Sequence, residues 1–174
     1  MAEKEELERW AVLEFAKLFT AKANRGALQF VELLKPPSPD ALCHLDKSDL
    51  FVEVAHVYGT ETDAKMALGR EGKSAPDPRV HNANAMISFD QRVIGPLNIL
   101  LKKKAGKTYD KSPVWLLVRS GFLLMDFDDF SLYQDSIAVP KNHPFEEIWL
   151  LCGKTSDSGA IQLASKNAAE RPHK

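Results

Sequence analysis

The pattern of hydrophobic and polar positions divides the chain into helical and strand-like segments. In residues 3–22 the apolar side chains recur at the spacing of one helix face, which predicts an amphipathic helix. That face is formed by Leu7, Trp10, Ala11, Phe15 and Leu18. Residues 28–34 are apolar enough for a short helix or a strand, and the prolines after them end regular structure. Residues 38–57 predict two strands around a tight polar turn centred on Asp46 and Lys47.

The second half of the chain predicts a loop, a helix and two buried strands. Residues 59–83 contain glycines, prolines and mixed charges, which indicate a long loop with at most one helical turn. A second helix is expected at residues 84–104 and is ended by Gly106. The runs VWLLV (114–118) and EIWLLC (147–152) are continuously apolar, which is typical of strands covered on both faces.

These elements together predict an α/β domain whose mixed β-sheet core is flanked by α-helices. The segment FLLMDFDDFSLY (122–133) is ambiguous, and a strand followed by a short helix is one interpretation. The length of 174 residues fits a single domain, which we expect to span residues 1–155. Because small and polar residues dominate after Gly153, residues 156–174 are expected to form a flexible tail.

Composition and charge leave the function open but disfavour some classes. Hydrophobic residues make up 44% of the chain and the net charge is −1, which does not favour a protein that coats nucleic acid. Cys43 and Cys152 lie in apolar runs without metal-ligand spacing, which favours buried thiols in a reducing compartment over a disulfide. The N-terminus lacks the apolar region of a signal peptide and no run approaches a membrane span, so a cytoplasmic protein is expected.

Two acidic residues occupy unexpected positions in the hairpin. A two-residue loop pairs Leu45 with Ser48, and continuing outward places Asp40 opposite Glu53. Directly opposed side chains share a face about 5 Å apart, where two carboxylates repel unless a cation lies between them. Mg²⁺ is a common solution, because it takes carboxylates together with water and phosphate oxygens. The alternative is that Asp40 only caps the turn while Glu53 faces solvent.

Each helix carries one charged residue on its expected apolar face. Glu14 lies in the middle of the first stripe, and an inward carboxylate is costly unless it is paired or bound to a metal. The second helix has an apolar face on which Lys104 continues the inward line. The residues of that face are Met86, Phe89, Val93, Leu97 and Leu100. The alternative for Lys104 is a solvated lysine that favours the helix dipole and extends outward.

The ordered set of Glu14, Pro39-Asp40, Glu53 and a following helix and strand resembles the PD-(D/E)XK superfamily of restriction-endonuclease-like nucleases. The resemblance spans residues 7 to about 120 and implies hydrolysis of a DNA or RNA phosphodiester with Mg²⁺ or Mn²⁺. It implies that Asp40 and Glu53 hold the metal together with the main-chain carbonyl of Val54 or Ala55. Glu14 would hold a second ion or the attacking water.

The sequence departs from the family at the motif lysine, because Ala55 stands where that lysine would follow Glu53. Some members supply the lysine from the next helix, and Lys104 is our candidate, with Gln91 and Lys107 as weaker ones. In the long loop four cations could grip a nucleic-acid backbone, although an ordinary solvated loop is favoured. These are Arg70, Lys73, Arg79 and His81.

Two hypotheses follow from the sequence. The first is a metal-dependent nuclease, active or degenerate, for which a homodimer is expected by analogy alone. The second is a non-enzymatic interaction or nucleic-acid-binding module on the same scaffold, in which the acids are solvated or structural. Only the first requires Asp40 and Glu53 to converge with Glu14 and Lys104 in one cleft.

Overall fold

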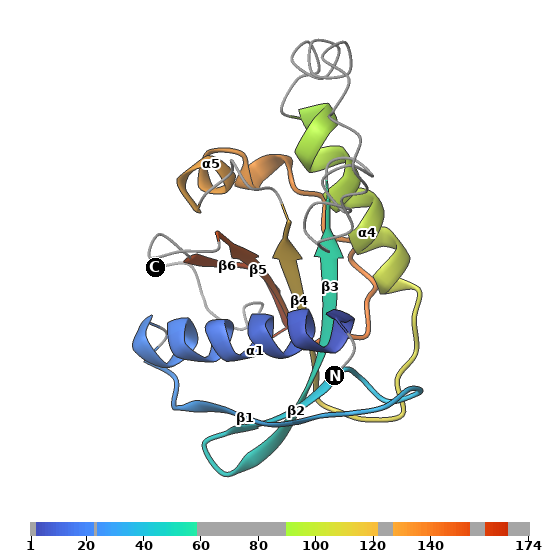
Figure 1. Ribbon diagram of the computed structural model, residues 1–174. Coiled ribbons are helices and arrows are strands. Elements are labelled where there is room, and N and C mark those ends of the chain that lie inside the picture. Colours follow the sequence, from blue (N-terminus) through green and yellow to red (C-terminus); the bar gives the residue numbers. More distant parts are fainter. Residues whose placement is uncertain (1–2, 23, 59–89, 122–126, 154–158, 167–174) are drawn as a thin grey trace, which may run out of the picture.

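The computed structural model describes residues 3–22, 24–58, 90–121, 127–153 and 159–166 (Figure 1). The elements in chain order are α1 (Glu3–Lys22), β1 (Leu28–Leu33), β2 (Ala41–Leu45), β3 (Ser48–Val57), the π-helical turn η1 (Asp90–Ile94), α4 (Gly95–Ala105), β4 (Val114–Ser120), α5 (Phe127–Leu132), the 3₁₀ turn η2 (Gln134–Ser136), β5 (Glu147–Cys152) and β6 (Gly159–Ser165). The predicted α/β class is therefore confirmed.

The six strands form one mixed sheet in the order β1-β2-β3-β4-β5-β6. β1, β2 and β3 are antiparallel neighbours, β3, β4 and β5 run parallel, and β6 returns antiparallel to β5. Parallel neighbours need a crossover connection, and α4 and α5 lie in the two crossovers. The predicted mixed sheet flanked by helices is thus present.

Helices cover both faces of the sheet. In Figure 1, α1 crosses β3, β4 and β5 and extends along β1, whereas α4 runs alongside β3. Trp115 and Leu117 of β4 pack in the core beneath α1, while Leu116 and Val118 pack in the core beneath α4 and α5. Every residue of β4 is buried because both faces are covered, as its continuous apolar run predicted.

The buried side of α1 differs from the predicted stripe. Leu7, Trp10 and Leu18 are only partly buried. The fully buried residues are Glu8, Ala11, Val12, Phe15, Ala16 and Phe19. Phe15 and Phe19 contact the rings of the buried Trp115 and the partly buried Trp149 at centroid distances of 5.3–6.4 Å. The helix is therefore rotated about its axis relative to the sequence prediction. Its packing against the sheet sets this rotation, which the spacing of apolar residues in the helix does not specify.

The hairpin has the predicted turn. Leu45 pairs with Ser48, and the loop residue Asp46 adopts a φ of 56°, a left-handed conformation that aspartate tolerates better than most residues. Cys43 and Cys152 are buried and form no disulfide, as predicted.

Two element predictions need correction. Residues 159–165 form β6 at the edge of the sheet, so the expected flexible tail is wrong for this segment. In the expected helix 84–104, the regular α-helix begins only at Gly95, after the π-helical turn η1. Residues 84–89 and the predicted loop 59–83 lie outside the described residues. No helix within the described ranges combines the length and apolar character that crossing a bilayer would need.

A buried polar network joins the end of α1 to the far strands. Glu147 is 1% exposed and accepts hydrogen bonds from Arg25 at 2.5 and 3.2 Å. It also accepts bonds from Trp149 Nε1 at 2.8 Å and Gln162 Nε2 at 3.0 Å. All of these donors bond to the carboxylate of Glu147, which compensates for the burial of its charge. Through Arg25, the network also ties the segment that follows α1 to β5 and β6.

Replacing Glu147 by alanine is expected to lower the free energy of unfolding by about 3–5 kcal/mol, because Arg25 and Trp149 would lose their buried acceptor. Urea unfolding measures the loss. The neighbouring Glu146 is the matched control, since its bond to Lys166 is partly exposed. Glu146→Ala should cost about 0–1 kcal/mol. Equal losses in the two variants would contradict this account of the network.

Candidate functional site

The site lies where β3 continues beyond the end of β2. β2 pairs with Ser48–Val52, and no strand in the described ranges pairs with Glu53–Val57 on that side. On the other side, Phe51 N–H donates to Pro113 and Gly121 N–H donates to the Val57 carbonyl. Because main-chain groups alternate along a strand, the N–H and C=O of Val54 point to the unpaired side. The structure thus selects Val54 over Ala55 as the carbonyl at this edge.

Asp40 and Glu53 meet at this edge in the predicted register. The last ladder pair is Ala41 with Val52, so the two acids are the next residues outward. Asp40 Oδ2 accepts a hydrogen bond from Val54 N–H at 2.8 Å. Glu53 is 5% exposed and alternates with Ala55 and Val57, whose side chains pack beneath α4. The interpretation of Glu53 as a solvated strand residue is therefore wrong.

Lys104 reaches Glu53 from the last turn of α4. Its Nζ lies 2.5 Å from Glu53 Oε1, and its side chain is 13% exposed. Lys107, from the loop after α4, lies 3.1 Å from the same oxygen and is 48% exposed. The prediction that Lys104 faces inward is confirmed, and Lys107 joins it as a second partner. α4 is held in place by Leu97 and Leu101, which are buried in the core.

The helix acid at the site is Glu8, which the sequence prediction missed. Glu8 is 5% exposed, lines the same cleft as Asp40 and Glu53, and pairs with Lys4 at 2.8 Å. Glu14 does not line the cleft, because it lies on another side of α1 and pairs with Lys17 at 3.3 Å. A signal for Glu8 was present in the sequence. Glu8 precedes Ala11, Val12 and Phe15 by three, four and seven residues, the spacing of one helix face.

These groups line one cleft of about 570 Å³ between the N-terminal part of α1 and the end of α4. Its charged and hydroxyl-bearing walls include Glu8, Asp40, Glu53, Lys104, Lys107 and Tyr109. In the part of the chain that the structure describes, no three histidine, cysteine or acidic side chains gather as a metal-binding group.

The two carboxyls of the hairpin have opposite electrostatic environments. Burial raises the pKa of Asp40 to about 6, and the negative charges of Glu53 and Glu8 add to this rise against the Val54 N–H bond. Burial alone would also raise the pKa of Glu53, but the bonds and charges of Lys104 and Lys107 outweigh it and hold that pKa below its ordinary value. Glu53 is therefore ionised under conditions where Asp40 takes up a proton.

Two side chains of the cleft have buried polar atoms without a hydrogen-bond partner among the described residues. They are the Tyr109 hydroxyl and both ring nitrogens of His56. Burial and the charge of Glu53 raise the pKa of Tyr109, so its hydroxyl stays protonated. Burial and the charge of Arg119 lower the pKa of His56 to about 4, so its ring is neutral at pH 7.

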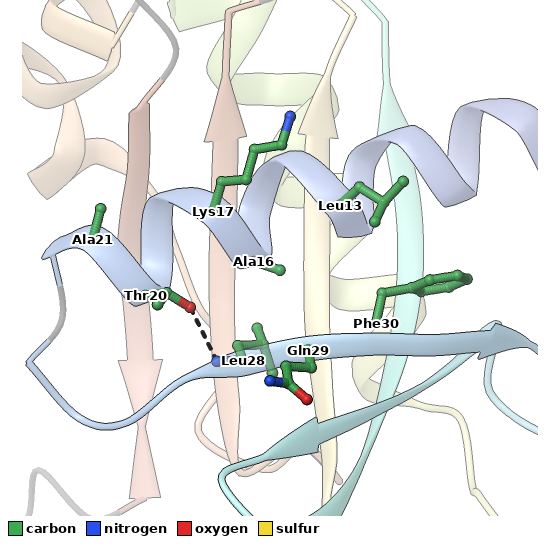
Figure 2. Close-up of a pocket in the computed structure, with 8 residues that line it drawn as sticks. All are labelled: Leu13, Ala16, Lys17, Thr20, Ala21, Leu28, Gln29 and Phe30. Carbon is green, nitrogen blue, oxygen red and sulfur yellow. Dashed lines mark hydrogen bonds between the residues drawn. The ribbon is translucent and has the colours of Figure 1, made fainter.

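A larger hollow of about 720 Å³ lies between α1 and β1 and offers little chemistry. Figure 2 shows its mostly apolar lining, with the Lys17 amine pointing away from it. Thr20 there accepts a bond from the Leu28 N–H at 3.0 Å, which ties β1 to the helix. Acidic side chains and buried polar atoms that lack a hydrogen-bond partner among the described residues line the cleft around Glu53 and not this hollow.

Some predicted site residues cannot be placed. Arg70, Lys73, Arg79 and His81 lie outside the described residues, and so does the side chain of Gln91.

Asp40→Asn is expected to change the pH dependence of stability. A folded-state pKa of about 6, above the ordinary 3.8, means that ionised Asp40 opposes folding, so its penalty grows as pH rises from about 4 to 6. Asparagine removes the charge and can still accept the Val54 N–H. The variant should therefore gain stability relative to wild type across this window and keep the gain above it.

Urea unfolding at a series of pH values measures the difference, with Asp135→Asn as an exposed control. A gap between Asp40→Asn and wild type that stays constant from pH 4 to 7 would show that burial does not perturb Asp40.

The site cannot be interpreted by similarity to characterised proteins. Comparison with protein-family models, with curated proteins and with solved structures finds no match to this chain.

Proposed function

We propose that this protein is a metal-dependent phosphodiester hydrolase acting on DNA or RNA, of the PD-(D/E)XK type that its sequence resembles. The observation that carries the proposal is the convergence of Asp40, Glu53 and Lys104 in one cleft. The acids come from a hairpin and the lysine from the following helix, in the order that the resemblance implies. Glu8 supplies the helix acid in place of Glu14.

The donor atoms at the edge of β3 suit a hard divalent cation. Asp40 has one carboxylate oxygen bonded to Val54 N–H and a second oxygen on the same group, and the Val54 carbonyl points to the same edge. Together with Glu53 these are oxygen ligands of the kind that Mg²⁺ and Mn²⁺ prefer. A bound ion lowers the pKa of a coordinated water and neutralises phosphate charge. Asp40, Glu53 and the Val54 carbonyl would hold it.

The remaining groups suit the polar demands of phosphodiester cleavage. Lys104 is largely buried and stays close to the acids, so its ammonium group can stabilise negative charge that develops on phosphate. It would replace the family lysine that is absent at Ala55. Glu8 reaches the cleft from α1 and can hold a water through a hydrogen bond. Both side chains come from rigid helices, which fixes their positions relative to the β3 edge.

One observation favours the second function class, a binding module without catalysis. Glu53 is already neutralised by two lysines, so a cation would have to displace at least one of them. If the lysines prevail, the half-exposed Lys107 binds anionic partners at the cleft without cleaving them. The two functions therefore differ in whether metal or lysine holds Glu53.

Mg²⁺ or Mn²⁺ is expected to raise the Tm of the wild type and to support cleavage of single- or double-stranded DNA or RNA. Asp40→Asn and Glu53→Gln should abolish both effects, because each removes a carboxylate ligand. Lys104→Met should keep the metal-dependent Tm rise and lose about 10²-fold or more in cleavage rate, the cost of one lost charge-stabilising donor. Cleavage that Glu53→Gln leaves intact would come from a contaminant and would end the proposal, as would wild type that neither responds to metal nor cleaves.

The choice of Glu8 over Glu14 is tested by a matched pair on one helix. Glu8→Gln should lower the cleavage rate about tenfold or more, because Glu8 lines the cleft and a positioned acid–base group contributes at least that much. Glu14→Gln should leave the rate unchanged, since Glu14 pairs with Lys17 outside the cleft. Loss of activity in Glu14→Gln alone would restore the sequence-based assignment.

A further inference from the structure

Hydrogen-bond donors outnumber acceptors at one end of the cleft. Lys104 and Lys107 both donate to a single oxygen, Glu53 Oε1. Burial and the adjacent Glu53 carboxylate raise the pKa of Tyr109, whose hydroxyl makes no hydrogen bond of good distance and angle within the described residues. A buried hydroxyl without a partner costs free energy that a partner would recover. Glu53 is therefore the shared acceptor for three donor groups at this end of the cleft.

The ring of Tyr109 is held by packing. Its ring packs against Phe145 at a centroid distance of 5.6 Å, and Phe145 is fully buried. The packing of the ring thus positions the hydroxyl. Lys107 is half exposed at the mouth of the same end, where an incoming anion would meet it first. A rigid neutral donor and a mobile cation side by side suit an anionic oxygen.

We propose that Lys107 and Tyr109 form a phosphate-binding subsite, in which Lys107 contributes charge and the Tyr109 hydroxyl donates to a phosphate oxygen. The subsite deepens the proposed function, on which it rests for the identity of its ligand as a phosphate of the nucleic-acid substrate. Neither residue belongs to the metal-binding set, and neither is needed to hold the metal. Their role is to position the phosphate.

Glu53 acts as the internal competitor of this subsite. Its carboxylate takes the bond from Lys107 and lies beside Tyr109, so an external phosphate must displace it. When Glu53 is drawn toward the β3 edge, Lys107 and Tyr109 become available to phosphate. Neutralising Glu53 by mutation should have the same effect without any metal.

The test is a calorimetric titration with inorganic phosphate in EDTA, which separates the subsite from hydrolysis. Glu53→Gln should bind phosphate about tenfold more tightly than wild type, because the competing charge is gone. Adding Tyr109→Phe or Lys107→Met to Glu53→Gln should each weaken binding about tenfold, as expected for one bond to a charged group. Lys103→Met, an exposed lysine on the same helix end, should have no such effect.

Tyr109→Phe should not lower the free energy of unfolding in urea, because the buried hydroxyl makes no hydrogen bond of good geometry within the described residues and its removal ends a desolvation cost. Phosphate affinity that is indifferent to Tyr109→Phe and Lys107→Met, or equally weakened by Lys103→Met, would overturn the subsite even if the protein cleaves nucleic acid. Phosphate binding that depends on both residues in a protein that cleaves nothing would uphold the subsite and refute the hydrolase.

A short single-stranded oligonucleotide distinguishes the sources of the phosphate. Competition with inorganic phosphate in Glu53→Gln would assign the subsite to a nucleic-acid phosphate. Phosphate binding without competition would assign it to a free phosphate group and overturn its place in substrate binding. In an active protein, Tyr109→Phe should raise KM more than it lowers kcat, which a purely structural tyrosine would not do.

Discussion

Unequal strand lengths create the candidate site. β3 has ten residues and β2 has five. The pairing between them stops at Ala41, the first residue of β2, which lies opposite Val52, while β3 continues to Val57. The main-chain groups beyond that point need other partners, and the Asp40 carboxylate takes the Val54 N–H. The same early end opens the edge to the cleft. A longer β2 would replace the acid by an ordinary ladder bond and close the space in which the charged groups meet.

The burial of Glu53 requires a cation beside its carboxylate. The last turn of α4 supplies Lys104 because Leu97 and Leu101 anchor that helix in the core. The pairing keeps Glu53 charged, while Asp40, without a cation so close, is driven toward its protonated form. One short segment thus contains two carboxyls in different states, an arrangement that suits both metal binding and proton transfer.

The buried glutamates Glu53 and Glu147 differ in how completely their hydrogen bonds are satisfied. Arg25, Trp149 and Gln162 all donate hydrogen bonds to Glu147, so its carboxylate is satisfied by groups of the protein itself. Glu53 instead shares a cleft with a half-exposed lysine and with the Tyr109 hydroxyl, which makes no hydrogen bond of good geometry in the described part of the chain. A fully satisfied network stabilises the protein, whereas a cleft with surplus donors can exchange an internal acceptor for a ligand.

The sequence by itself determined the α/β class, the hairpin turn, the Asp40–Glu53 register and the inward direction of Lys104, because each follows from local periodicity or turn length. Tertiary structure decided which acid of α1 enters the cleft. Leu7, Trp10 and Leu18 are as apolar as Val12 and Phe19, so only packing against Trp115 and Trp149 sets the rotation of the helix. It also decided that Lys107 joins Lys104 and that residues 159–165 pair with β5. Those contacts join residues far apart in the chain, and no local pattern contains them.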